Sequence, residues 1–229
     1  MSSQAPRTFS VDVGDAATTA SLYPAATRAR AAIVLAHGAG APQTHPWMVA
    51  MARALAGRGV DVVTFNFLYT ERKRRMVDRP PVLEATWRAV VEAVRARADV
   101  AHERLFAGGK SMGGRIATQV AAREGAAWPI AGLVLLGYPL HPPGRPEARR
   151  DAHLPDVRVP MLFVQGERDA FGTRDELGPI VERLKAKLPG TRLYVVEGGD
   201  HSLATRGGPA GAGEAVLAAV ADEVVRFIA

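Results

Sequence analysis

The feature that most constrains the fold is a regular alternation of short apolar runs with longer amphipathic segments. Residues 8–13 and 18–23 predict an opening hairpin around Gly14. Further strands are expected at residues 32–36, 60–67, 104–108, 130–136, 159–165 and 193–196, and helices at residues 46–58, 80–98, 112–124, 174–188 and 214–228. This pattern predicts an α/β fold, a mainly parallel sheet of about seven to eight strands with helices on both faces, in one domain over residues 1–229.

Length and composition exclude several classes of protein. A chain of 229 residues is long enough for one α/β domain with a sizeable core. With no cysteine, disulfides, thiolate metal sites and a cysteine nucleophile are excluded. No apolar run reaches the roughly 18–20 residues that span a bilayer, and residues 1–10 lack the pattern of a secretory signal. We therefore expect a cytoplasmic protein that does not bind membranes.

The net charge of +6 and the pI near 10.1 raise the question of nucleic-acid binding. Only four of the 29 basic residues are lysine, and the arginines are mostly scattered among abundant alanines rather than gathered in one stripe. This distribution indicates a compositional bias of the whole chain. We expect a small-molecule acyl substrate and no nucleic-acid partner, and the sequence carries no signal for an oligomeric state.

The strongest local motif is Gly-Lys-Ser-Met-Gly at residues 109–113, between a predicted strand and a predicted helix. Glycine is needed on both sides because a side chain at Gly109 or Gly113 would collide with a neighbouring strand or helix. The sharp turn exposes the Ser111 hydroxyl at the carboxyl edge of the sheet, where ligands bind in such folds. Ser111 is therefore the predicted nucleophile, and the Met112 N–H, at the helix N-terminus, is a predicted oxyanion donor.

The glycine-containing segments at residues 37–42 and 109–113 allow three other interpretations. A phosphate-binding loop requires glycine at position 104, which is Arg104. A dinucleotide-binding loop is disfavoured because Gln43 stands where its third glycine belongs. A Gly-Ser turn without any function remains an alternative at this point.

A serine nucleophile needs a base, and the base needs an orienting carboxylate. In a parallel α/β sheet with the serine at such a strand-to-helix turn, these residues follow in the chain order Ser, Asp or Glu, His. After Ser111, the chain places Asp169 and then His201, each directly after a predicted strand and at the same sheet edge as Ser111. Glu167 and Asp175 are nearby alternatives for the carboxylate. A turn carboxylate and a structural loop histidine are the alternative interpretations of Asp169 and His201.

The second oxyanion donor is expected in the glycine-rich loop at residues 37–42, after the first parallel strand. Its glycines allow backbone N–H groups to turn toward a substrate carbonyl. Ala39 is the first choice for this donor and Gly40 the second, whereas His37 is expected to shape the loop.

Taken together, the motifs resemble an α/β-hydrolase subfamily related to dienelactone hydrolase. The matching segments lie between residues 32 and 203 and read LAHGAGAP, FNFLY, PPVLEATWRAV, GGKSMGGR, LLGYPLHPPGRPE, FVQGERDAFGT and GGDHSL. The resemblance implies an α/β-hydrolase fold with Ser111, Asp169 and His201 in the catalytic roles. Dienelactone hydrolase itself uses a cysteine nucleophile, so its activity is not implied. The subfamily is also similar to a scaffold subunit of a eukaryotic histone-acetyltransferase complex, which keeps a non-catalytic interaction module as the alternative function.

The predicted chemistry is that of a carboxylesterase-like serine hydrolase, which needs neither a metal nor an organic cofactor. The loop at residues 139–160 is too short for a multi-helix cap, so we expect a minimal cap, an open pocket and a preference for short acyl groups. Arg72, Arg74 and Arg75 follow the strand at residues 60–67 and would attract acidic substrates if they lay over the site. A solvated basic loop is the alternative, and the sequence favours it.

Overall fold

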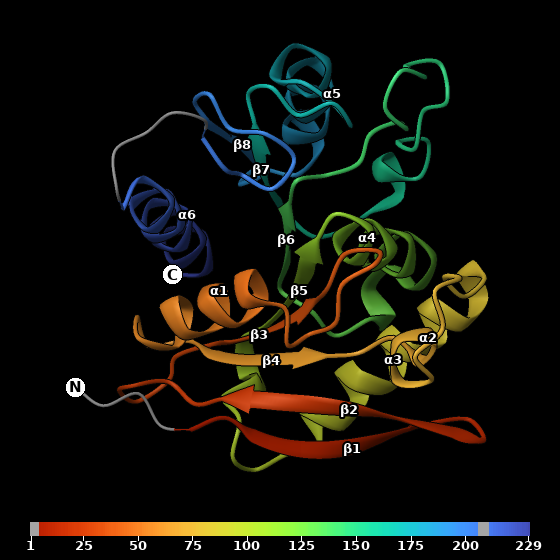
Figure 1. Cartoon of the computed structure of the whole chain (residues 1–229), viewed down its shortest axis with the longest axis vertical. Coiled ribbons are helices and arrows are strands. Elements are labelled where there is room, and N and C mark those ends of the chain that lie inside the picture. Colours follow the sequence, from red (N-terminus) through yellow and green to blue (C-terminus); the bar gives the residue numbers. More distant parts are fainter. Residues whose placement is uncertain (1–4, 206–210) are drawn as a thin grey trace.

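The computed structural model describes residues 5–205 and 211–229, and the predicted domain's residues 1–4 and 206–210 lie outside it. These residues form one eight-stranded sheet in the order β1-β2-β4-β3-β5-β6-β7-β8 (Figure 1). The strands are β1 Arg7–Val13, β2 Ala16–Tyr23, β3 Ala32–Ala36, β4 Asp61–Phe65, β5 Leu105–Lys110, β6 Gly132–Leu136, β7 Met161–Gly166 and β8 Arg192–Val196. The predicted hairpin of β1 and β2 joins the sheet through an antiparallel pairing of β2 with β4. The six strands from β3 to β8 are all parallel to one another.

Helices cover both faces of this sheet, as the alternating pattern predicts. They are α1 Pro46–Ala56, α2 Leu68–Glu71, α3 Pro80–Arg95, α4 Met112–Glu124, α5 Arg174–Lys187 and α6 Ala212–Ile228, with short 3-10 turns at His102–Arg104, Gly125–Ala127 and Leu154–Asp156. In Figure 1, α1 and α6 pack together on one face, and α3 and α4 lie on the other. The prediction of a mainly parallel sheet with helices on both faces is confirmed.

Two apolar cores lie on opposite sides of the sheet. One joins α3, α4 and α5 to the sheet around Trp87 and Ile116, and the other joins α1 and α6 to it around Met51 and Val220. Because the central parallel strands are covered on both faces, every residue of β3, β4 and β6 is buried. These rigid strands hold the loops at their carboxyl ends in fixed positions. Among the described residues, no helix combines the length and the apolar character that crossing a membrane requires.

The strand predicted at residues 60–67 is shorter in the structure and gives way to α2, which the sequence analysis did not predict. β4 ends at Phe65, and the Phe67 N–H donates to His37 Nε2 (3.1 Å) instead of to a neighbouring strand. The side chain of Asn66 likewise accepts the Gln43 N–H at 2.9 Å. Side-chain partners thus replace the ladder and turn the chain away from the sheet edge.

Candidate active site

Ser111 lies in a sharp turn between β5 and α4. Its backbone has φ 49° and ψ −115°, a conformation that residues other than glycine rarely adopt, and its N–H donates to Leu136 O at 2.9 Å. A Cβ atom at Gly109 would lie 2.2 Å from Ala36 O, and one at Gly113 would lie 2.6 Å from the same oxygen. Both glycines are therefore required for the close approach of the turn to β3.

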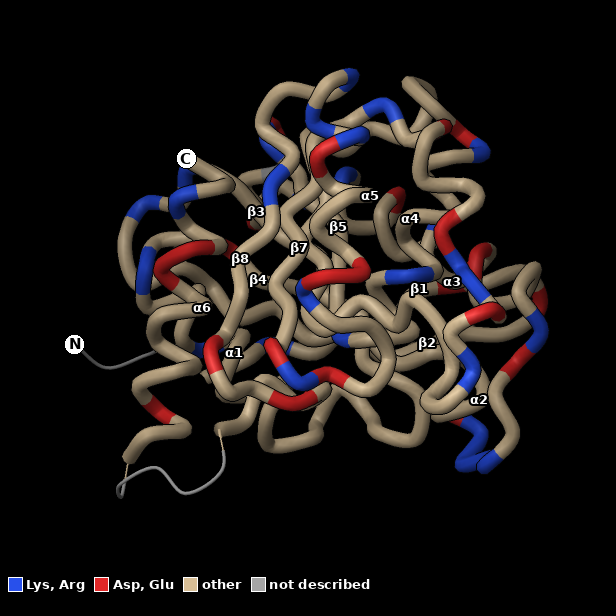
Figure 2. Tube along the Cα trace, turned by 90° about the horizontal axis from the view of Figure 1, so that it is seen from above, with Lys and Arg blue, Asp and Glu red and all other residues tan. Residues whose placement is uncertain are grey.

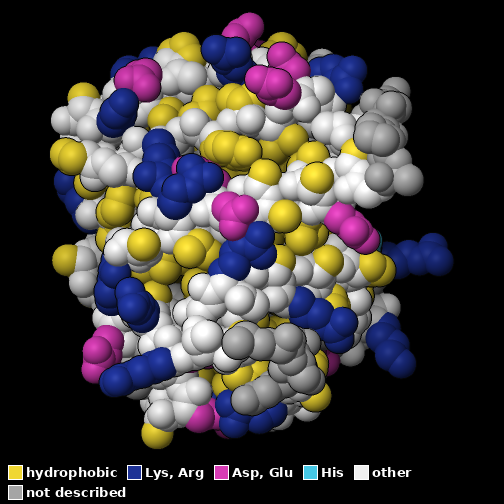
Figure 3. Space-filling view, turned by 90° about the vertical axis from the view of Figure 1, so that its left-hand side faces the viewer, with side chains coloured by type: hydrophobic (Ala, Val, Ile, Leu, Met, Phe, Trp, Pro, Cys, Tyr) yellow, Lys and Arg dark blue, Asp and Glu magenta, His cyan; other side chains and the backbone are white. Residues whose placement is uncertain are grey.

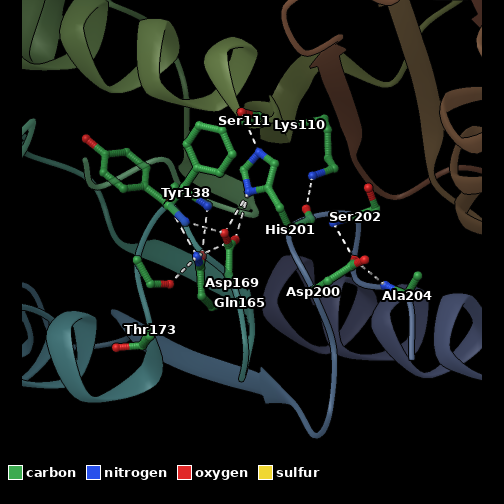
Figure 4. A network of polar contacts seen from close by, with 12 residues as sticks. Lys110, Ser111, Tyr138, Gln165, Asp169, Thr173, Asp200, His201, Ser202 and Ala204 are labelled. Carbon is green, nitrogen blue, oxygen red and sulfur yellow. Dashed lines mark hydrogen bonds and ion pairs between the residues drawn. The ribbon is translucent and has the colours of Figure 1, made fainter. Parts of the chain in front are cut away.

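Ser111, His201 and Asp169 form a continuous chain of hydrogen bonds (Figure 4). The Ser111 Oγ lies 2.9 Å from His201 Nε2, and His201 Nδ1 lies 2.8 Å from Asp169 Oδ2 and 3.0 Å from Oδ1. Because an ionised carboxylate only accepts hydrogen bonds, the proton of the neutral imidazole belongs on Nδ1. Nε2 is then free to accept the serine hydroxyl proton, which is the arrangement that general-base activation requires.

The Asp169 carboxylate is fully buried and held by two further donors. Gln165 Nε2 donates to Oδ2 at 2.7 Å, and the Phe171 N–H donates to Oδ1 at 2.8 Å. The amide oxygen of Gln165 in turn accepts the Tyr138 N–H at 2.8 Å, so this side chain joins the loops after β6 and β7. Sequence reasoning missed Gln165. The available signal was a polar residue at the end of a wholly apolar strand, four residues before Asp169.

The two alternative carboxylates lie away from the imidazole contact. Glu167 accepts the Gly198 N–H at 2.7 Å, which ties its loop to the loop that carries His201. Asp175 lies in the first turn of α5, where a carboxylate stabilises the helix N-terminus. The structure therefore brings Asp169, and not these two residues, to His201.

His201 is fixed from two further sides. The Phe171 ring stacks on its imidazole at a centroid distance of 4.1 Å, and Lys110 Nζ donates to its backbone carbonyl. Burial lowers the pKa of Lys110 to about 8, while the charges of Asp169 and Asp200 oppose this shift. Lys110, the residue before Ser111, thus connects the loop that carries His201 to the turn that carries Ser111.

His37 shapes the loop that follows β3, as the sequence analysis expected. The ring is fully buried. Its Nδ1 lies 2.8 Å from Gly38 O, and its Nε2 accepts the Phe67 N–H. Burial lowers the pKa of His37 to about 4, so the ring is neutral near pH 7. The C=O and N–H of a trans peptide point in opposite directions, so holding Gly38 O against His37 aims the Ala39 N–H away from the core.

A cavity of about 550 Å³ opens directly over the serine, and Ser111 and His201 both line it. Its wall includes Ala39 and Met112, the two residues predicted as leading oxyanion donors, whereas Gly40 is not among the described lining residues. Met112 is the first residue of α4, so its N–H has no partner within the helix. A volume of this size accommodates a small organic substrate.

The basic run after α2 does not contribute to this cavity. Arg72, Arg74 and Arg75 are exposed, Arg74 pairs with Asp78, and none of the three is among the lining residues that the structure describes. Figure 2 shows this segment beside α2, at the margin of the molecule. The structure agrees with the solvated-loop alternative for this run.

Two further histidines make structural contacts away from the cavity. His141 Nε2 lies 3.0 Å from Glu176 Oε1, and His153 Nε2 lies 2.7 Å from Thr118 Oγ1. The second contact attaches the loop at residues 139–160 to α4. Neither imidazole lies in the cavity wall that the structure describes.

A family model described as an alpha/beta hydrolase domain matches residues 29–229. The chain belongs to the α/β-hydrolase family. Three solved structures illustrate the similarity of its fold. A dienelactone hydrolase from Anabaena variabilis is 20% identical, with a TM-score of 0.71 over 97% of this chain and 96% of that chain. A serine hydrolase without a lid, XC6422 from Xanthomonas campestris, is also 20% identical, with a TM-score of 0.72 over 97% and 93%.

The third structure is Est1E from Butyrivibrio proteoclasticus with bound ferulic acid. It is 16% identical, with a TM-score of 0.73 over 96% of this chain and 99% of that chain. At these identities the similarity shows a common α/β-hydrolase fold, and the chemistry of this member has to be argued from its own site.

Proposed function

We propose that this α/β-hydrolase is a serine hydrolase that cleaves a small ester or related acyl compound through an acyl-enzyme. The observation that carries the proposal is the hydrogen-bonded series Ser111–His201–Asp169 with its hydroxyl end facing a cavity of about 550 Å³. The positive φ of Ser111 supports it, because backbone strain of this kind concentrates at functional sites.

The proposed reaction has two balanced halves. His201 Nε2 takes the Ser111 proton as Oγ attacks the substrate carbonyl, and the Met112 and Ala39 N–H groups stabilise the oxyanion. The tetrahedral species collapses as the imidazolium returns that proton to the leaving oxygen, which departs as an alcohol. Water, deprotonated by the same nitrogen, then attacks the acyl-enzyme. The bond between the acyl carbon and Oγ breaks as the imidazolium returns the proton to Oγ, which releases the acid and free Ser111.

Replacement of the nucleophile tests this proposal. Ser111→Ala is expected to lose about 10⁴- to 10⁶-fold in kcat on 4-nitrophenyl acetate, because the acyl-enzyme can no longer form. The unmodified chain is expected to react with a fluorophosphonate probe at Ser111, which intact-mass and peptide mass spectrometry locate.

Ser202→Ala provides a matched control. Ser202 lines the same cavity, but its hydroxyl has no role in the proposed steps, so turnover and labelling are expected to change less than threefold. Unlabelled Ser111 in a folded chain would contradict the proposal. It would favour the alternative of a hydrolase-fold interaction module like the histone-acetyltransferase scaffold subunit, which co-purification with partner proteins would then test.

A further inference from the structure

The cavity wall is basic as well as apolar. Three cationic side chains line it, Lys110, Arg115 and Arg150, and its described lining contains no Asp or Glu. Trp47 and Phe171 supply aromatic surface in the same wall. Lys110 donates to the His201 carbonyl, so its ammonium already has a partner. The two guanidinium groups have no acidic partner among the described lining residues.

Arg115 is carried by the helix that begins at the nucleophile. Its backbone N–H donates to Ser111 O at 3.1 Å, so it lies one helical turn, about 6 Å along the axis, from the serine. Its Nε is buried without a hydrogen-bond partner in the described structure. Burial lowers its pKa, and the positive charge of Arg150 contributes to the lowering, so the two guanidinium groups lie close enough to repel.

Arg150 comes from a different element, the loop at residues 139–160. Its backbone is fixed at both ends, since its N–H donates to Leu140 O at 2.8 Å and its carbonyl accepts the Tyr138 hydroxyl at 2.7 Å. The neighbouring Arg149 pairs with Asp151 at 2.7 Å, and Arg145 lies near Glu147. Within the part of the chain that the structure describes, Arg150 forms no such pair.

Arg115 and Arg150 are half-buried in the cavity wall, where an unpaired charge is less well solvated than on the open surface. Neither Arg115 nor Arg150 makes an ion pair with any residue that the structure describes, although their charges repel. On the α6 side of the molecule, by contrast, acidic and basic side chains are interspersed on the surface among apolar ones (Figure 3). Two half-buried like charges are costly to hold together unless a bound anion compensates them.

We propose that Arg115 and Arg150 form an anion subsite that binds a carboxylate or phosphate group of the substrate beside Ser111. This inference rests on the proposed hydrolase function and narrows it to acyl compounds that carry a second, anionic group. Arginine suits the role because its planar fork binds carboxylate and phosphate oxygens in pairs. Because Arg115 and Ser111 line the same cavity one helical turn apart, a bound anion would lie a few bonds from the scissile carbonyl.

A matched pair of substrates tests the subsite. The 4-nitrophenyl monoester of adipic acid carries a free carboxylate, and 4-nitrophenyl methyl adipate is its neutral counterpart. At constant ionic strength, the anionic ester is expected to have a kcat/KM about tenfold or more above that of the neutral ester. Competition against the neutral ester by adipate and by inorganic phosphate distinguishes a carboxylate site from a phosphate site.

Substitutions then assign the preference to the two arginines. Arg115→Gln and Arg150→Gln are each expected to lose about 10- to 100-fold in kcat/KM on the anionic ester and less than threefold on the neutral ester. Arg115→Lys, which keeps the charge, is expected to recover part of the loss. Arg145→Gln is the matched control, because Arg145 lies exposed in the same loop and outside the described cavity wall.

The outcomes separate this inference from the function on which it rests. Equal kcat/KM for both esters, unchanged in the glutamine variants and without competition by either anion, would overturn the subsite while leaving the hydrolase intact. A chain that hydrolyses neither ester and resists the fluorophosphonate probe would overturn the hydrolase. In that case the subsite would still be supported if calorimetry showed that adipate or phosphate binds and that Arg115→Gln abolishes this binding. If neither anion bound, the subsite would be overturned together with the hydrolase.

Discussion

Gln165 shows how one buried amide connects the loops after β6 and β7 beside the candidate site. Its oxygen accepts the Tyr138 N–H, and its nitrogen donates to Asp169 and to Gly172 O at 2.8 Å. A neutral amide donates and accepts hydrogen bonds without adding charge. A second carboxylate at this position would place another negative charge beside Asp169. We regard Gln165 as a positioning residue that acts through Asp169.

Removing this amide is expected to affect both activity and stability. Gln165→Leu leaves the buried Tyr138 N–H without a partner and lowers the free energy of unfolding by about 1–3 kcal/mol. The lost hydrogen bond to Asp169 is expected to lower kcat by roughly fivefold to tenfold, with little change in KM. Denaturant titration and steady-state kinetics on 4-nitrophenyl acetate measure the two effects.

A second buried hydrogen bond provides the control for that experiment. The Thr191 hydroxyl accepts the Met161 N–H at 3.2 Å at the start of β7, the opposite end of the strand from Gln165. Thr191→Val is expected to destabilise the fold to a similar degree with kcat unchanged. An equal loss of kcat in both variants would mean that Gln165 acts only through stability.

At the scale of elements, periodicity and turn motifs were enough to predict the strands, every α-helix except α2, and the edge where Ser111, Asp169 and His201 meet. They were not enough where a choice depends on three-dimensional contacts. Asp169 and Glu167 are two residues apart on one loop, and only the folded loop determines which carboxylate reaches the imidazole. No sequence period marks this difference, because the irregular loop backbone sets both directions.

The basic residues near the site illustrate the same limit. The basic run after α2 is recognisable in the sequence because its charges are contiguous. The two arginines that line the cavity are 35 positions apart, so no local pattern connects them. Arg115 ends the segment GGKSMGGR, two residues after the serine motif, but the sequence alone gave it no role. Arg150 reaches the cavity only because its loop folds back over α4, with Leu154 fully buried as the anchor.

The anchored loop at residues 139–160 leads to a prediction about substrate size. Its attachment through Leu154 and His153 to α4, above a cavity of about 550 Å³, leaves a fixed and limited space for the acyl chain. We expect kcat/KM for 4-nitrophenyl acetate or butyrate to exceed that for the palmitate ester by about 100-fold or more. Comparable values across chain lengths, measured below the micelle concentration, would contradict this expectation.

For the whole molecule, buried neutral histidines link stability to pH. Burial lowers the pKa of His37 to about 4, and burial together with the charge of Arg115 lowers the pKa of His153 to about 4. The ordinary histidine value near 6.5 applies to the unfolded chain, so between pH 6.5 and 4 the unfolded state binds more protons than the folded state. Stability is therefore fully present above pH 6.5 and falls as the pH is lowered through this window.

Acid unfolding of the His153 variant tests this linkage. His37 contributes a loss on the order of 2–3 kcal/mol between pH 7 and pH 4, and His153, which solvent reaches more readily, contributes less. His153→Gln keeps a donor for Thr118 but cannot gain a proton, so its free energy of unfolding is expected to decline less steeply from pH 6.5 to pH 4 than that of the unmodified chain. Thr118→Val removes the same contact and keeps the imidazole, so it is expected to lower stability at neutral pH while retaining the slope. Parallel pH profiles for all three chains, from urea titrations at half-unit intervals, would show that His153 takes no part in the acid response.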